Sequence, residues 1–188
     1  MNRAHIEFLS SPQWAEMLRS DLLPWLTSVG PLGDDIVEIG PGPGLTTDLL
    51  REQAARVTAI EVDPRLARRL AERLVGTNVE VLEGDATETV LESDRFSAVT
   101  CFSVLHHIST PQDQDRLFAE ISGLLRPGGL FVGVDARDLE QLRQAHDDDT
   151  FTPVPRETLP RRLKTAGLEI VYVDEDEYQI RFVARKPA

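Results

Sequence analysis

The chain has 188 residues, of which 28% are charged and 41% are hydrophobic, so it can form one globular domain with a substantial core. Its 32 acidic and 20 basic side chains give a formal net charge of -12, which repels a polyphosphate backbone and argues against nucleic acid as a partner. The single cysteine, Cys101, cannot form an internal disulfide. No signal peptide or membrane-spanning run is apparent, and we expect a cytoplasmic protein with no membrane partner.

The N-terminal part of the chain is expected to be helical. Pro12 to Leu26 has apolar residues at helical spacing, but Pro24 would cost about 3 kcal/mol inside a continuous helix. We therefore expect a kink or two short helices here. In a single domain spanning 1–188, residues 1–33 would form an N-terminal helical cap.

Short apolar runs then alternate with helical patterns, which is typical of βαβ units around a parallel sheet. The expected strands are Asp35 to Ile39, Val57 to Val62, Val79 to Leu82, Phe96 to Phe102 and Leu130 to Val134. The expected helices follow Gly44, begin at Pro64, run from Pro111 to about Arg126, and run from about Arg156 to Ala166. The regular alternation lapses at 135–155, which we interpret as a possible lid.

The last two apolar runs are Glu169 to Val173 and Gln179 to Ala184, with only an acidic turn between them. So short a connection requires an antiparallel pair. The sequence therefore predicts an α/β fold whose sheet is mostly parallel and ends in an antiparallel hairpin.

A glycine-rich turn, Val37 to Gly44, joins the first strand to its helix. Gly40, Gly42 and Gly44 permit positive φ and let a ligand approach the main chain, with Pro41 between the first two. The spacing G-x-G-x-G departs from the G-x-G-x-x-G of dinucleotide enzymes. Glu38, two residues before the first glycine, suits a cationic ligand group better than a pyrophosphate.

Acidic side chains also end the second and third strands. Glu61, followed by Val62, is placed to accept hydrogen bonds from both hydroxyls of a ribose. Asp85 can accept a hydrogen bond from an adenine amino group, and the Ala86 N–H can donate to the ring. Because ligands bind at the carboxyl edge of open parallel sheets, these positions together predict a nucleoside site.

In several motifs, the sequence resembles the class I S-adenosylmethionine-dependent methyltransferases of small-molecule type. The matching pieces are E-I-G-P-G-P-G (38–44), A-I-E-V-D-P (59–64), E-G-D-A (83–86), F-S-V-L-H-H-I (102–108) and L-L-R-P-G-G-L-F-V (124–132). The resemblance implies a Rossmann-like, doubly wound sheet of seven strands in the order 3-2-1-4-5-7-6, with strand seven antiparallel.

The resemblance also implies how S-adenosyl-L-methionine is bound. Gly40 and its neighbours would contact the methionine moiety, Glu61 the ribose, and Asp85 with Ala86 the adenine. At the end of the fourth strand, Phe102 and Ser103 stand where methyltransferases of nucleobase and glutamine amino groups carry Asn-Pro-Pro-Tyr, which disfavours those acceptors.

His106 and His107 follow that strand and are the candidate catalytic residues. An imidazole facing the cleft could take a proton from an oxygen or nitrogen nucleophile near neutral pH, and the resemblance favours His107. Packing in the core is the alternative for either ring. The pair together with Asp147 to Asp149 fits no compact metal-ligand spacing, so we expect no metal.

The predicted function is transfer of a methyl group from S-adenosylmethionine to an O, N or C nucleophile of a small-molecule acceptor. The alternative is a non-catalytic regulator or partner subunit that binds S-adenosylmethionine. Methyl transfer needs no covalent nucleophile, so we interpret Cys101 as strand packing. Trp14 and Trp25 are interpreted as helix packing, with the lining of an acceptor pocket as the alternative.

Overall fold

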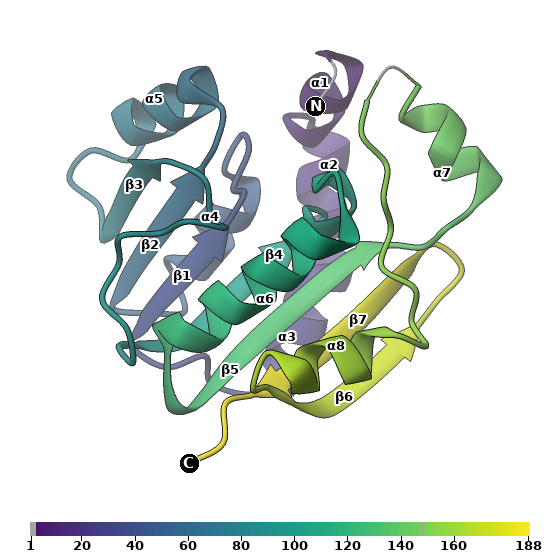
Figure 1. Ribbon diagram of the computed structural model, residues 1–188. Coiled ribbons are helices and arrows are strands. Elements are labelled where there is room, and N and C mark those ends of the chain that lie inside the picture. The colour runs from purple at the N-terminus through teal and green to yellow at the C-terminus, as the bar shows by residue number, and fades with distance from the viewer. Residues whose placement is uncertain (1–2, 148) are drawn as a thin grey trace.

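Seven strands form one twisted sheet in the order β3-β2-β1-β4-β5-β7-β6 (Figure 1). This computed structural model describes residues 3–147 and 149–188, so Met1, Asn2 and Asp148, which belong to segments discussed above, lie outside the described residues. The strands are β1 (Asp35–Ile39), β2 (Arg56–Glu61), β3 (Val79–Glu83), β4 (Phe96–Phe102), β5 (Leu125–Ala136), β6 (Glu169–Glu175) and β7 (Gln179–Arg185). Neighbours from β3 to β5 are parallel, whereas β7 is antiparallel to β5 and β6. The predicted fold class and strand order are confirmed.

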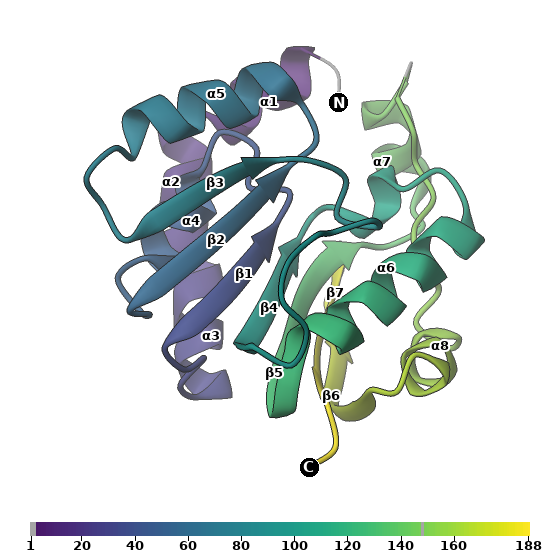
Figure 2. The same ribbon diagram turned by 60° about the vertical axis from the view of Figure 1, so that its left-hand side comes forward.

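Helices cover both faces of the sheet (Figure 2). They are α1 (Arg3–Leu9), α2 (Pro12–Met17), α3 (Leu23–Val29), α4 (Leu45–Leu50), α5 (Pro64–Arg73), α6 (Pro111–Leu124), α7 (Glu140–Ala145) and α8 (Leu159–Thr165), with a π-helical turn η1 (Leu18–Leu22) and a 3-10 turn η2 (Leu105–His107). Apolar side chains of α6 and α8 pack on one face, and those of η1, α3 and α4 pack on the other. None of the helices in the described ranges is long and apolar enough to cross a membrane.

The irregularity expected near Pro24 is present as a π-helical turn and not as a break between two helices. The backbone of Met17, Leu22 and Leu23 stays helical, and Pro24 is the second residue of α3. The π-helical turn joins α2 to α3, and the Leu23 N–H donates to the carbonyl of Leu18. Leu18, Leu22 and Leu26 are all buried against the sheet, so the N-terminal segment keeps one continuous apolar face in spite of the proline.

Two expected boundaries are wrong at the start of β5. Helix α6 ends at Leu124 rather than near Arg126, and β5 starts at Leu125 rather than Leu130. The partners of β4 jump from Leu125 to Leu130, so the Arg-Pro-Gly-Gly stretch between them bulges from the ladder. The turn residues are therefore accommodated inside the strand. Helix α7 lies in 135–155, where no regular element was expected.

A pair of glycines tests this packing. In β5, a Cβ on Gly133 would lie 2.1 Å from Cζ of Phe182, a fully buried ring on β7. Gly133→Ala should therefore lower the free energy of unfolding by about 1–3 kcal/mol through overpacking. A Cβ on Gly123 in α6 would meet no atom within 4 Å, so Gly123→Ala should raise it by about 0.5–1 kcal/mol. Urea denaturation checks both, and equal effects would contradict the packing described.

Candidate active site

The carboxyl ends of the parallel strands meet at one edge of the sheet, and the strand order reverses between β1 and β4. Ligands bind in the crevice outside such a reversal. Two adjacent hollows open there, with volumes of about 440 and 250 Å³. They share Gly40, Val62, Val104 and His107 as a common wall. One elongated ligand can therefore extend from the first hollow into the second.

The two hollows divide the residues that the sequence singled out. The larger hollow lies between the end of β3 and the turn after β4. It is lined by Ile60, Asp85, Ala86 and Ile108. The smaller hollow is lined by Pro41, Gly42, Glu61, Phe102 and Ser103. Most of the predicted binding residues are thus brought together around one crevice.

Three predicted site residues lie behind these walls rather than in them. Glu38, Gly44 and His106 line neither hollow. A Cβ on Gly44 would lie 2.2 Å from a methyl group of Leu70, so this glycine permits close packing of the loop on α5. Glu38 and His106 are buried and hold other groups of the site, as described below.

The glycine-rich turn is shaped by positive backbone angles at its three glycines. A Cβ on Gly40 would lie 2.5 Å from Val104, so only a glycine lets β1 end this close to the loop after β4. A Cβ on Gly42 would meet no protein atom within 4 Å, although Gly42 lines the smaller hollow. The main chain at Gly42 is therefore open to a ligand.

The carboxylate of Glu61 is buried beneath this turn. Its two oxygens accept the N–H groups of Gly42 and Asp63, each at 2.9 Å. The side chain also lines the smaller hollow. Each carboxylate oxygen can accept a further hydrogen bond, so a ligand with a pair of hydroxyls can still be bound here.

Glu38 is almost completely buried, and the hydroxyls of Thr46 and Thr47 donate to its carboxylate, the latter at 2.6 Å. Burial raises the pKa of Glu38 to about 7, and the two hydroxyl hydrogen bonds oppose that rise. These bonds tie the end of β1 to the first turn of α4. Glu38 therefore stabilises the glycine-rich turn from the buried side, away from the hollows.

His106 and His107 differ in their surroundings. His106 is 2% exposed, and its Nδ1 is hydrogen-bonded to the carboxylate of Asp135 on β5. His107 lines both hollows, and its Nδ1 lies 3.9 Å from a carboxylate oxygen of Asp149. Of the two candidates, His107 is the one that can touch a bound molecule.

Several residues that line the smaller hollow belong to segments in which no chemical motif was recognised from the sequence. Leu9 and Trp14 contribute from the N-terminal helices, and Asp149 and Thr150 from the stretch after α7. Trp14 also packs against the core, as its first interpretation predicts. Cys101 is fully buried and burial raises the pKa of its thiol well above the usual value, in keeping with strand packing.

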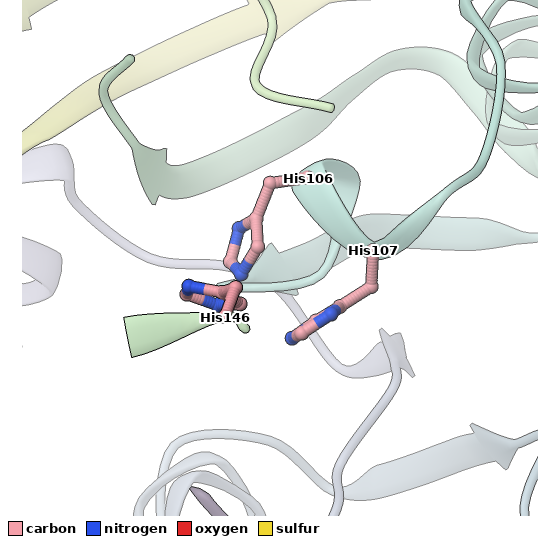
Figure 3. A group of neighbouring side chains, drawn as sticks. All are labelled: His106, His107 and His146. Carbon is pink, nitrogen blue, oxygen red and sulfur yellow. The ribbon is translucent and has the colours of Figure 1, made fainter. Parts of the chain in front are cut away.

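His146, which the sequence analysis did not single out, lies beside this pair. Its ring centroid is 5.0 Å from that of His106 and 5.3 Å from that of His107 (Figure 3). Only the proximity of Asp147 to Asp149 in the sequence hinted at this segment. No spacing rule would have joined a histidine after α7 to a pair after β4.

Residues 37–133 match the methyltransferase domain family, and the chain belongs to that family. The resemblance to the methyltransferases is thereby confirmed at the level of the domain family. A solved S-adenosylmethionine-dependent methyltransferase from Aquifex aeolicus superposes with a TM-score of 0.75, at 18% identity over 99% of both chains.

Curated relatives are similar over part of their length. An uncharacterized methyltransferase from Geobacillus kaustophilus is 32% identical over 118 residues, which are 62% of this chain and 54% of the relative. A probable ribosomal RNA small subunit methyltransferase A from Thermococcus onnurineus is 51% identical over 53 residues, which are 28% of this chain and 20% of the relative. The chain thus spans about half or less of the length of these relatives.

The comparisons correct the expected partners. We expected a small-molecule acceptor, with no nucleic acid and no membrane, and a protein partner only in the alternative of a non-catalytic partner subunit. A similar structure is a complex of the Haloferax volcanii Trm112 methyltransferase activator with a methyltransferase, at a TM-score of 0.73 and 16% identity over 97% of this chain and 98% of that chain. Composition and charge therefore do not exclude macromolecular partners for this fold, because a partner protein can dock on a local surface whatever the net charge.

The pKa of Glu38 predicts a pH dependence of stability. The folded chain holds this proton between about pH 4.5 and 7, where the unfolded chain releases it, so stability falls as pH rises through this window. The loss should reach about 3 kcal/mol. Glu38→Gln cannot ionise and should remove most of it, which urea denaturation at a series of pH values measures. Parallel curves for the two proteins would contradict the burial of an ionisable Glu38.

Proposed function

We propose that this chain transfers a methyl group from S-adenosyl-L-methionine to an oxygen, nitrogen or carbon nucleophile of a small-molecule acceptor. When bound, S-adenosylmethionine supplies a methyl group on a positively charged sulfur. The observation that carries the proposal is the pair of adjoining hollows, because most of the acids and glycines expected for the donor line them, with His107 in the wall that the two hollows share.

The residues present suit this donor. In our proposal Asp85 and Ala86 hold the adenine in the larger hollow and Glu61 accepts from the ribose hydroxyls. Gly40, Pro41 and Gly42 then face the methionine part, with Val62, Phe102 and Ser103 completing the wall. Glu38 and Gly44 act through the loop, Glu38 by its bonds to two threonines and Gly44 by close packing. The acidic net charge of the chain also favours a cationic ligand.

The acceptor is proposed to enter beside His107. This side chain is partly exposed to the hollows, whereas His106 behind it is almost fully buried. His107 can take a proton from the nucleophile or hydrogen-bond to it, and His106 with Asp135 positions the turn that carries it. The smaller hollow has a total volume of only about 250 Å³, which suits a small acceptor better than a folded macromolecule.

The segments at 1–33 and 135–155 are proposed as a cap and a lid over this crevice. Leu9 and Trp14 from the first segment and Asp149 and Thr150 from the second line the same hollow. Covering the acceptor keeps bulk water from the reacting groups, which helps a reaction whose main requirement is correct alignment.

Replacement of Glu61 tests the donor site. Glu61→Ala removes the proposed pair of charge-assisted hydrogen bonds to the ribose, each worth about 1.5–3 kcal/mol, and should weaken binding of S-adenosylhomocysteine at least about 10-fold. Titration calorimetry measures the dissociation constant. Glu83→Ala removes an exposed acid at the end of the neighbouring strand β3, outside both hollows, and should bind normally. An unchanged constant in folded Glu61→Ala would refute the ribose assignment.

Replacement of His107 tests the acceptor site. With labelled S-adenosylmethionine, the chain should methylate the small-metabolite fraction of a cell extract and not its ribosomal RNA.

His107→Ala should lower single-turnover methyl transfer by about 10²–10⁴-fold, with nearly normal affinity for S-adenosylhomocysteine. Retained turnover per folded molecule would remove His107 from the acceptor site. Label in ribosomal RNA would refute the small-molecule acceptor, and donor binding without any transfer would favour the regulator.

A further inference from the structure

We propose that His106, His107 and His146 form a binding site for one divalent transition-metal ion at the acceptor end of the crevice. Each of the three imidazoles offers a ring nitrogen, and these nitrogens all lie within 4.8 Å of one another. The rings come from two separate segments, η2 and the turn after α7, and they converge on a common point (Figure 3).

The hydrogen bond between His106 Nδ1 and Asp135 leaves Nε2 as the nitrogen that can bind an ion. Asp135 is 1% exposed, and its carboxylate accepts a hydrogen bond from the N–H group at Nδ1 of His106. The lone pair therefore lies on Nε2, which is buried and has no hydrogen-bond partner among the described residues. Leaving such a nitrogen unsatisfied costs free energy unless something binds to it. A carboxylate behind a histidine is also the usual arrangement around metal-binding imidazoles.

His146 is oriented in the same way by a different acceptor. Its Nδ1 lies 2.7 Å from the carbonyl oxygen of Leu142, one turn earlier in α7. Because a carbonyl can only accept, Nδ1 carries the hydrogen and the lone pair of this ring lies on Nε2. Two of the three imidazoles thus have their tautomer fixed by groups outside the cluster, as metal ligands require.

The cluster is also held together by its surroundings. Phe151 packs against His146 with ring centroids 4.5 Å apart and against His106 at 5.4 Å. The Thr152 N–H donates to the carbonyl of His106 at 2.7 Å. Such a supporting shell keeps the ligands near their required positions. A zinc ion holds nitrogens at about 2.0–2.1 Å, hence about 3.4 Å from one another in a tetrahedral site, so small ring rotations would complete the geometry.

The chemistry of the ligands indicates the class of ion. Three neutral imidazoles without a thiolate suit Zn²⁺, Fe²⁺, Co²⁺ or Ni²⁺ rather than Mg²⁺ or Ca²⁺, which prefer oxygen ligands. Three protein ligands leave a coordination position open, which is typical of catalytic rather than structural sites. Since His107 lines both hollows, the cluster lies directly beside the space proposed for the acceptor.

The role of the ion rests on the proposed function and changes one part of it, because a His107 that binds the ion with its lone pair holds the acceptor through the ion and does not take the proton itself. An acceptor hydroxyl or thiol bound to the ion would lose its proton to solvent at lower pH than when free. The lone pair left on that oxygen or sulfur then forms the bond to the methyl carbon, while the electron pair of the breaking carbon–sulfur bond stays on the donor. The ion itself is neither oxidised nor reduced.

Cobalt titration tests the site without donor or acceptor. After treatment with EDTA, the chain should bind one Co²⁺ with visible d–d absorption, and Zn²⁺ should displace it. His146→Ala and His106→Ala should weaken binding by about 100-fold or more, and Asp135→Asn by about 10–100-fold. Gln144→Ala, which removes an exposed side chain of α7 and no member of the cluster, should bind as wild type.

Binding of S-adenosylhomocysteine and a melting curve show whether each variant is folded. Loss of Co²⁺ binding in His146→Ala, with binding of S-adenosylhomocysteine retained, would support the metal site. No Co²⁺ binding by the wild type, or unchanged binding in folded His146→Ala, would overturn it and leave the cluster as aromatic packing. Failure of nucleoside binding in a wild type that still binds Co²⁺ would instead count against the proposed function.

Discussion

The parallel pairing of β1 with β4 is the constraint on which the site depends. Ile36 to Ile39 pair in register with Ala98 to Cys101, and the strand order reverses at this pair. The chain therefore leaves the two strands toward opposite faces, and a crevice remains between the loops. Gly40 marks how closely these loops approach, because a Cβ there would collide with Val104. The glycine-rich turn, the acids and the histidines are all arranged around this one reversal.

Buried acids around the crevice are stabilised by different partners. Glu61 accepts two backbone N–H groups, Glu38 accepts two threonine hydroxyls, and Asp135 is paired with His106. Removal of a carboxylate from water is costly unless hydrogen bonds replace the lost solvation. Burial raises the pKa of Glu38 to about 7, although two hydroxyl groups donate hydrogen bonds to it. The charge of this acid behind the turn therefore changes near neutral pH.

Helix α6 and the segment after α7 connect the histidine cluster to the core. Gln114 in α6 is 1% exposed, and its Nε2 donates to the carbonyl of Leu105 at 3.0 Å and to that of Thr152 at 2.7 Å. One buried amide thus joins the turn that carries His106 and His107 to the stretch that follows His146. This link explains why segments far apart in sequence form one compact group beside the crevice.

The sequence by itself determined the sheet and most of the residues that line the crevice. Alternating runs and helices predict parallel strands, and the short acidic turn requires the antiparallel β6–β7 pair, because such local patterns depend only on neighbouring residues. Glycines and acids at strand ends, such as Gly42 and Glu61, could likewise be assigned, since the carboxyl ends of parallel strands share an edge. Only the tertiary structure decided the bulge within β5 and the contribution of Trp14 to the hollow. It also decided the meeting of His146 with His106, because contacts between distant segments depend on how the whole chain packs and leave no spacing to read.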